Sequence, residues 1–151
     1  MDEDLYRQTY HQVNQRRCVF EKSILSRRSA CNRAKRFRLA DREGVSCISP
    51  ADQERCRLFL DYLRQQARFA LGLTGIEGQL PFNKEIKVQT GGLLGLQQML
   101  DDAEQPAEQV RDVNELVREA LDRYERLEDI PFQRLMPSIV SFRPREPRKR
   151  R

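Results

Sequence analysis

The stretch that begins at Ser49 constrains the fold most, because it carries a complete helix start signal followed by helical apolar spacing. Ser49 suits the N-cap, Pro50 stands at the first helical position, and Asp52 at the third completes a variant of the capping box. The apolar positions that follow are Cys56, Leu60, Leu63, Ala67 and Ala70. This spacing predicts a long amphipathic helix that ends near Gly72.

The residues before this helix predict two short helices and a hairpin. Helical spacing covers Leu5–Val13 and continues around Val19–Leu25. Apolar and charged residues then alternate, which favours a β-hairpin with a turn over Asp41–Gly44. On this alternation the inner face of the hairpin is expected to carry Phe37, Leu39, Val45 and Cys47.

The second half of the chain predicts further helices. A short extended stretch, Glu85–Gln89, is expected to lead through a glycine pair into a helix of about ten residues. The longest helix is expected from Pro106 to about Leu127, and the stretch 131–142 is expected to be irregular or extended. The fold class is therefore α+β and mostly helical, with one small domain over residues 1–142 and a disordered basic tail over 143–151.

Composition limits the classes of protein that this chain could belong to. Of its 151 residues 38% are apolar and 34% charged, and no apolar run approaches the roughly 18 residues of a membrane span. The first residues are acidic and lack an apolar stretch, so we expect no secretory signal and no membrane partner. A cytoplasmic location follows as an expectation, and there cysteines serve more often as thiols or metal ligands than as disulfides.

The net charge of +5 conceals a strongly uneven distribution. Residues 16–42 hold ten Lys/Arg against two acidic residues, whereas residues 101–130 hold eleven Asp/Glu against four arginines. Residues 131–151 are again basic. The basic and acidic segments either pair with each other within the fold or bind partners of opposite charge. An acidic protein partner or a larger redox complex is therefore one expectation.

All four cysteines fall within 39 residues, at Cys18, Cys31, Cys47 and Cys56. The short C-x2-C pairs typical of structural zinc sites are absent, which weakens zinc more than an iron–sulfur cluster, whose ligands tolerate long intervals. Arginines beside these cysteines would offset the negative charge of four thiolates. We therefore predict a metal centre with these four ligands, an iron–sulfur cluster (4Fe–4S among the types) by a small margin over zinc.

Two other interpretations of the cysteines stay open. Free cysteine is among the most buried residue types, so the four could be ordinary core thiols, and redox disulfides are a third reading. His11 is the only histidine and is expected to be solvated. Neither a nucleophile elbow nor a nucleotide-binding loop is present, so the sequence gives no argument for an enzyme.

Basic residues raise nucleic-acid binding as the alternative function. The candidate anion-binding residues are Arg16, Arg17, Arg36, Arg38, Arg148, Lys149, Arg150 and Arg151. The glycine pair after Thr90 could also present backbone N–H groups to an anion, although close helix packing explains it better. The leading prediction is a small cytosolic accessory protein whose metal centre serves electron transfer, redox sensing or a larger complex; the alternative is a nucleic-acid-binding regulator with structural cysteines.

Overall fold

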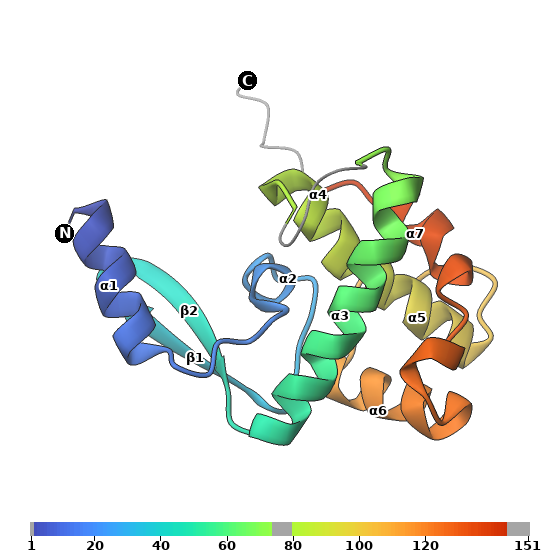
Figure 1. Ribbon diagram of the computed structural model, residues 1–151, viewed down its shortest axis with the longest axis horizontal. Helices are drawn as coiled ribbons and strands as arrows, with labels where there is room; N and C mark the ends of the chain where they lie inside the picture. Colours follow the sequence, from blue (N-terminus) through green and yellow to red (C-terminus); the bar gives the residue numbers. More distant parts are fainter. Residues whose placement is uncertain (1, 74–79, 145–151) are drawn as a thin grey trace.

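Helix α3 (Pro50–Ala70) runs through the middle of the molecule, and the later helices pack along it (Figure 1). Its predicted start is confirmed: the Ser49 hydroxyl accepts a hydrogen bond from the Asp52 backbone N–H at 3.3 Å. Its end is confirmed too, since Gly72 follows with φ +67°, a conformation that favours glycine. The predicted stripe is buried from Cys56 to Ala67, whereas Ala70 in the last turn is exposed.

The computed structural model describes residues 2–73 and 80–144. Within them the chain forms one small domain, α+β and mostly helical, as predicted. The proposed tail over 143–151 lies outside the described residues from position 145 onward. The remaining elements are α1 (Glu3–Val13), α2 (Glu21–Leu25), β1 (Ala34–Leu39), β2 (Arg42–Cys47), α4 (Phe82–Ile86), the π-helix η1 (Lys87–Gly91), α5 (Gly92–Asp101), α6 (Val113–Tyr124), the 3-10 helices η2 (Leu127–Asp129) and η3 (Phe132–Leu135), and α7 (Met136–Ser141).

Strands β1 and β2 form the predicted antiparallel hairpin, but with a shorter turn than expected. Leu39 pairs with Arg42, so only two residues form the turn. Phe37 therefore lies opposite Gly44, and the expected common inner face is wrong. Because side chains alternate along each strand, Phe37 and Leu39 occupy one face, and Val45 and Cys47 occupy the other.

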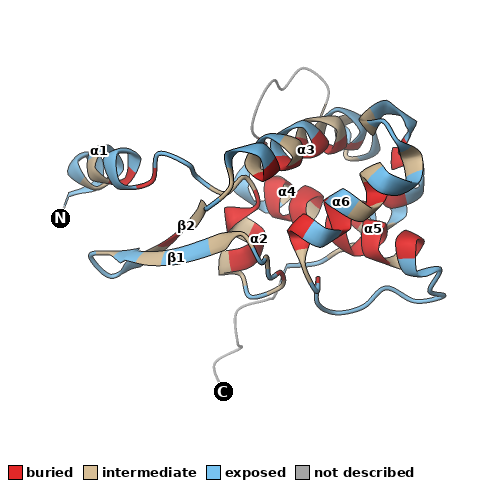
Figure 2. Ribbon diagram, turned by 90° about the horizontal axis from the view of Figure 1, so that it is seen from below, coloured by how far each residue is buried: buried red, intermediate tan, exposed pale blue. Residues whose placement is uncertain are grey.

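Both faces of the hairpin are covered by short helices. On the Phe37 face, Tyr10 of α1 packs with its ring centroid 5.9 Å from that of Phe37. On the opposite face, Arg36 donates to the Ile24 carbonyl of α2 at 3.3 Å. The buried carboxylate of Glu21 joins these layers, since it accepts hydrogen bonds from the Tyr10 hydroxyl and from the Val45 N–H. Helix α1 and the hairpin extend to one side of the helical body (Figure 2).

Elements α4, η1 and α5 follow one another without a break, so the predicted extended stretch over Glu85–Gln89 is wrong. The glycine pair lies inside this run and not at a helix start, which removes the anion-binding interpretation. A Cβ on Gly91 would lie 2.7 Å from the Ile139 Cα and 2.8 Å from the Ser138 carbonyl oxygen of α7. The glycine therefore permits close helix packing, the use that the sequence favours.

Helix α6 begins later than the sequence predicts. Asp112 is its N-cap and accepts a hydrogen bond from the Glu115 N–H at 3.0 Å, so the helix does not start at Pro106 and α3 is longer. Val110 instead forms a β-bridge with Ser29. The apolar stripe of α6 is nevertheless buried, and the helix contacts both α3 and α5.

The stretch 131–142 is also more regular than expected, because it forms η3 and α7. Pro131 precedes the 3-10 helix, and Phe132, Leu135 and Ile139 are buried against the core. The sequence of this stretch shows no clear helical pattern. Burial of its apolar side chains, rather than local helix propensity, therefore stabilises the helix. None of the helices in the described ranges is long and apolar enough to cross a membrane.

Candidate metal centre

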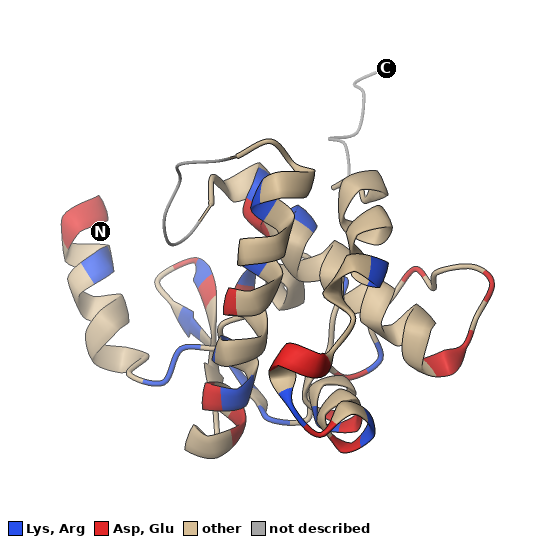
Figure 3. Cartoon of the chain, turned by 45° about the vertical axis from the view of Figure 1, so that its right-hand side comes forward, with Lys and Arg blue, Asp and Glu red and all other residues tan. Residues whose placement is uncertain are grey.

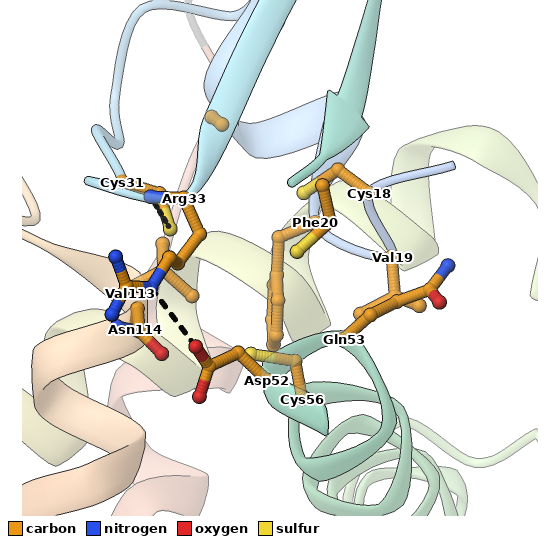
Figure 4. A pocket seen from close by; sticks show the side chains of 12 residues that line it. Cys18, Val19, Phe20, Cys31, Arg33, Asp52, Gln53, Cys56, Val113 and Asn114 are labelled. Atoms are coloured by element: carbon orange, nitrogen blue, oxygen red, sulfur yellow. Dashed lines mark hydrogen bonds and ion pairs between the residues drawn. The ribbon is translucent and has the colours of Figure 1, made fainter. Parts of the chain in front are cut away.

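The four cysteines line one cavity, although they come from four separate segments of the chain (Figure 4). Cys18 lies just before α2, Cys31 just before β1, Cys47 at the end of β2, and Cys56 in the second turn of α3. In the close-up the side chains of Cys18, Cys31 and Cys56 lie around Phe20, and Cys47 lines the same cavity. The structure thus brings together all four predicted ligands.

Backbone hydrogen bonds hold three of these segments side by side. The Cys18 N–H donates to the Val45 carbonyl at 3.0 Å, and the Cys47 N–H donates to the Arg16 carbonyl at 2.8 Å. The Ile48 N–H donates to the Arg33 carbonyl at 2.9 Å. The end of β2 therefore lies between the Cys18 segment and the segment that follows Cys31. Helix α3 starts directly after β2 and brings Cys56 to the same place.

The cavity is apolar and small. Besides the sulfurs it is lined by side chains such as Val19, Phe20 and Val113. The space among the lining atoms measures about 320 Å³ including its opening to solvent, of which about 20 Å³ can hold the centre of a water molecule. As described, the cavity has room for about one water. A larger group would require the cysteine segments to move apart.

Helix N-termini meet at this cavity. The first turn of α3 contributes Asp52 and Gln53, the first turn of α6 contributes Val113 and Asn114, and Phe20 is the residue that caps α2. The Arg33 backbone N–H donates to the Cys31 sulfur at 3.5 Å. The positive ends of helices favour negative charge, so the surroundings suit thiolate ligands.

A buried carboxylate with two arginine partners stands at the edge of the cavity. Asp52 accepts from Arg33 Nε at 2.9 Å and pairs with Arg55 at 2.7 Å. Burial raises the pKa of Asp52, but the hydrogen bond from Arg33 and the charges of Arg55 and Arg118 outweigh it and lower the pKa overall. The group keeps a net positive charge beside the sulfurs.

Burial also dominates the chemistry of the thiols. It raises the pKa of Cys18 to about 12, and it raises the pKa of Cys31 and Cys56 as well. The negative charge of neighbouring thiolates adds to each increase. Without a compensating cation these thiols are neutral and unreactive at pH 7.

A single metal ion sets a strict requirement on the distances between its sulfur ligands. All four cysteines are free thiols. A tetrahedral zinc ion with Zn–S bonds of about 2.3 Å needs sulfurs about 3.8 Å apart. Among the described residues no group of three or more His, Cys, Asp or Glu side chains is placed to hold one metal ion. As they stand, the four thiols are therefore not arranged around a single ion, and the cavity among them is smaller than a multi-atom cluster.

The other predicted site residues are less well placed. Arg17 pairs with Glu21 at 3.0 Å, and both Arg36 and Arg38 pair with Glu43, so these charges are partly satisfied within the fold. Arg16 is exposed, and so is His11, as expected. Residues Arg148, Lys149, Arg150 and Arg151 lie outside the described part of the chain.

Sequence reasoning missed the Arg33–Asp52 pair, because Asp52 has an evident role as a capping residue and the two residues are 19 positions apart. A signal was available in the arginines beside Cys31 and Cys56. Comparison with protein-family models, characterised proteins and solved structures finds no match for this chain. The site must therefore be interpreted from its own geometry.

Proposed function

We propose that this protein binds an iron–sulfur cluster through Cys18, Cys31, Cys47 and Cys56. The observation that carries the proposal is the convergence of all four cysteines of the chain, from four separate segments, on one apolar cavity. Four thiolates are the usual ligand set of a [4Fe–4S] cluster. When bound, such a cluster supplies one-electron redox chemistry.

The surroundings of the cavity support this proposal. Val19, Phe20 and Val113 give the cavity apolar walls, which would limit the access of water to a cluster and influence its potential. The positive N-terminal ends of α3 and α6, together with Arg33 and Arg55, would offset the negative charge of four thiolates. The chain's own residues thus bind the cluster, screen it and compensate its charge.

The biological role that fits best is that of a small accessory protein for electron transfer or redox sensing in the cytoplasm. All four cysteines of the chain would be used as ligands. An acidic protein partner or a larger redox complex would exchange electrons with it. Zinc remains the second choice for the metal, because the short C-x2-C pairs typical of structural zinc sites are absent from the sequence.

The visible spectrum of the protein tests the proposal. Protein purified without oxygen is expected to be brown, with a broad sulfur-to-iron absorption band that reductant bleaches. Cys56→Ser should remove most of the band, because it replaces a ligand in the second turn of α3. The matched control is Ala67→Ser, which adds the same hydroxyl on the same buried stripe, away from the cavity, and should leave the band unchanged.

A colourless wild-type protein would defeat the iron–sulfur proposal. If it also contained no zinc, the four thiols, of which Cys56 is buried and the others partly buried, would have only a packing role. Nucleic-acid binding would then take its place, on the strength of exposed basic residues such as Arg16 and Lys35. That function requires an affinity for DNA or RNA that falls steeply with added salt, because bound Lys and Arg displace counterions from phosphates.

A further inference from the structure

A second cavity lies beside the cysteine cavity and is lined by three cationic residues. These are Arg17, Lys22 and Arg64, while Cys18 and Val19 line both cavities. The space among its lining atoms measures about 460 Å³ including its opening to solvent, of which about 170 Å³ can hold the centre of a water molecule. This is many times what one water needs, so the second cavity has room for a small ligand.

Two of the three cations already have a carboxylate partner. Glu21 accepts a hydrogen bond from Arg17 Nε at 3.0 Å, and Glu85 accepts one from Arg64 Nε at 3.1 Å. Both carboxylates are buried and have further donors, such as the side-chain amide of Gln89, which donates to Glu85 at 3.0 Å. Each carboxylate therefore compensates an arginine within the fold.

Lys22 is the third cation, and its ammonium has no carboxylate of its own. The side chain is partly buried, yet its Nζ forms no hydrogen bond or ion pair with the residues at 2–73 and 80–144. Burial lowers the pKa of Lys22, and so do the charges of Arg17 and Arg64. The two buried carboxylates oppose this shift without cancelling it. An uncompensated ammonium beside two arginines favours an anion in the cavity.

The acidic segment over residues 101–130 does not supply this anion. Its acidic residues gather on the loop after α5 and around α6 (Figure 3). The cavity is lined instead by the segment before α2, by α2 itself, by α3 and by η1. Among the positions that the structure describes, no residue of the acidic segment lines it.

We infer that the cavity lined by Arg17, Lys22 and Arg64 binds a phosphate group, either as inorganic phosphate or as part of a small phosphate ester. The ammonium of Lys22 is available as a donor, and so are the terminal nitrogens of Arg17, of which only Nε is bonded to Glu21. A phosphate suits these donors better than a carboxylate, because it carries about two negative charges at pH 7 and accepts several hydrogen bonds.

The lining also limits the size of the ligand. No aromatic ring is found among the described residues that line this cavity, so it offers no surface on which a nucleotide base would stack. The inference goes beyond the proposed function and does not depend on it, since no cysteine acts as a donor to the phosphate.

The melting temperature of the full-length protein tests this site. It is measured against the concentration of inorganic phosphate and, separately, of glycerol phosphate, with chloride keeping the ionic strength constant. We expect a rise that follows saturable binding, because the ligand stabilises only the folded state. Tighter binding of glycerol phosphate would support the site and identify an ester as its ligand, and tighter binding of inorganic phosphate would support it with the free ion as its ligand.

Lys22→Met should raise the dissociation constant by about tenfold or more, because it removes a charge-assisted hydrogen bond. The variant should fold, since the ammonium has no partner to lose, and circular dichroism checks this. The matched control is Lys35→Met, the same change at an exposed lysine of β1, which should leave the dissociation constant unchanged.

An equal dissociation constant in the wild type and in Lys22→Met would place the phosphate elsewhere and overturn the inference. A rise in melting temperature that does not saturate and is the same in all three proteins would overturn it too. That result is the general effect of phosphate, which is excluded from protein surfaces.

Discussion

Arg33 donates from Nε to Oδ2 of Asp52 at 2.9 Å and so connects the segment after Cys31 to the helix that carries Cys56. The Asp52 carboxylate is almost fully buried, and its second oxygen pairs with Arg55. One carboxylate thus fixes the relative position of two ligand segments and retains two positive charges beside the sulfurs. The same pair makes the site depend on residues that no metal would touch.

Arg33→Met is expected to lower the free energy of unfolding by about 1 kcal/mol, because Asp52 loses one of its two partners while Arg33 is partly screened by solvent. Urea denaturation measures this change. Arg38→Met, at a side chain that is 73% exposed, should shift the free energy by less than about 0.5 kcal/mol. Equal effects of the two variants would mean that the buried pair contributes nothing to stability.

Val117→Asp should destabilise the protein by several kcal/mol, because Val117 of α6 is 1% exposed and the new carboxylate would be buried without a partner. The melting temperature measures the effect. The matched control is Val140→Asp in α7, where the side chain is 49% exposed and the cost should be small. An unchanged melting temperature for the first variant would contradict the burial of the α6 stripe.

Gly91→Ala should lower the free energy of unfolding by about 2 kcal/mol. A Cβ at this position would press on the backbone of Ile139, which cannot move aside as a flexible side chain can. Gly95→Ala is the milder comparison, since its nearest neighbours are side-chain atoms of Ser138 at 3.1 Å. Thermal denaturation ranks the two. The reverse order would show that α7 packs on this helix differently from the structure.

Stability should fall as the solution becomes acidic below about pH 4.5, and Glu85 is one cause. Burial raises the pKa of Glu85, but its hydrogen bonds with Arg64 and Gln89 outweigh burial and lower the pKa below 4.5. Since the folded state holds this proton more weakly than the unfolded state, its contribution is present above pH 4.5 and is lost as the pH falls through the folded pKa.

Glu85→Gln distinguishes the contribution of this carboxylate to acid sensitivity from that of other acidic groups such as Asp52. The free energy of unfolding of the variant should be about 2 kcal/mol lower than that of the wild type at pH 7. It should then fall less than that of the wild type on acidification. Urea midpoints at pH 7 and pH 4 give the comparison. Parallel pH profiles for the two proteins would assign the acid sensitivity to residues other than Glu85.

Local signals explain which parts of the fold could be predicted. The Ser49 cap, Pro50 and the apolar stripe specify α3 within a few residues, and Cys56 falls on that stripe. Alternation specified the two strands but not their register, because the two-residue turn depends on Ala40 adopting φ 57°. A one-residue difference in register moves Val45 to the other face.

Long-range contacts explain what could not be predicted. Val110 looks like the start of an α6 stripe, yet it pairs with Ser29 across 81 positions, a contact that no local pattern reveals. The convergence of the cysteines was expected from their clustering, but the partners of the site were not. Arg33 finds Asp52 only after the hairpin and α3 have packed together.

The content of iron and acid-labile sulfide per chain tests the central claim most directly. For protein purified without oxygen and reconstituted with iron and sulfide, a [4Fe–4S] cluster on the four cysteines should give about four of each per chain. Cys56→Ser should lower both values, whereas Ala67→Ser should not. About one zinc and no sulfide would indicate a single-ion site, and neither metal nor sulfide in the reconstituted wild type would contradict the metal centre altogether.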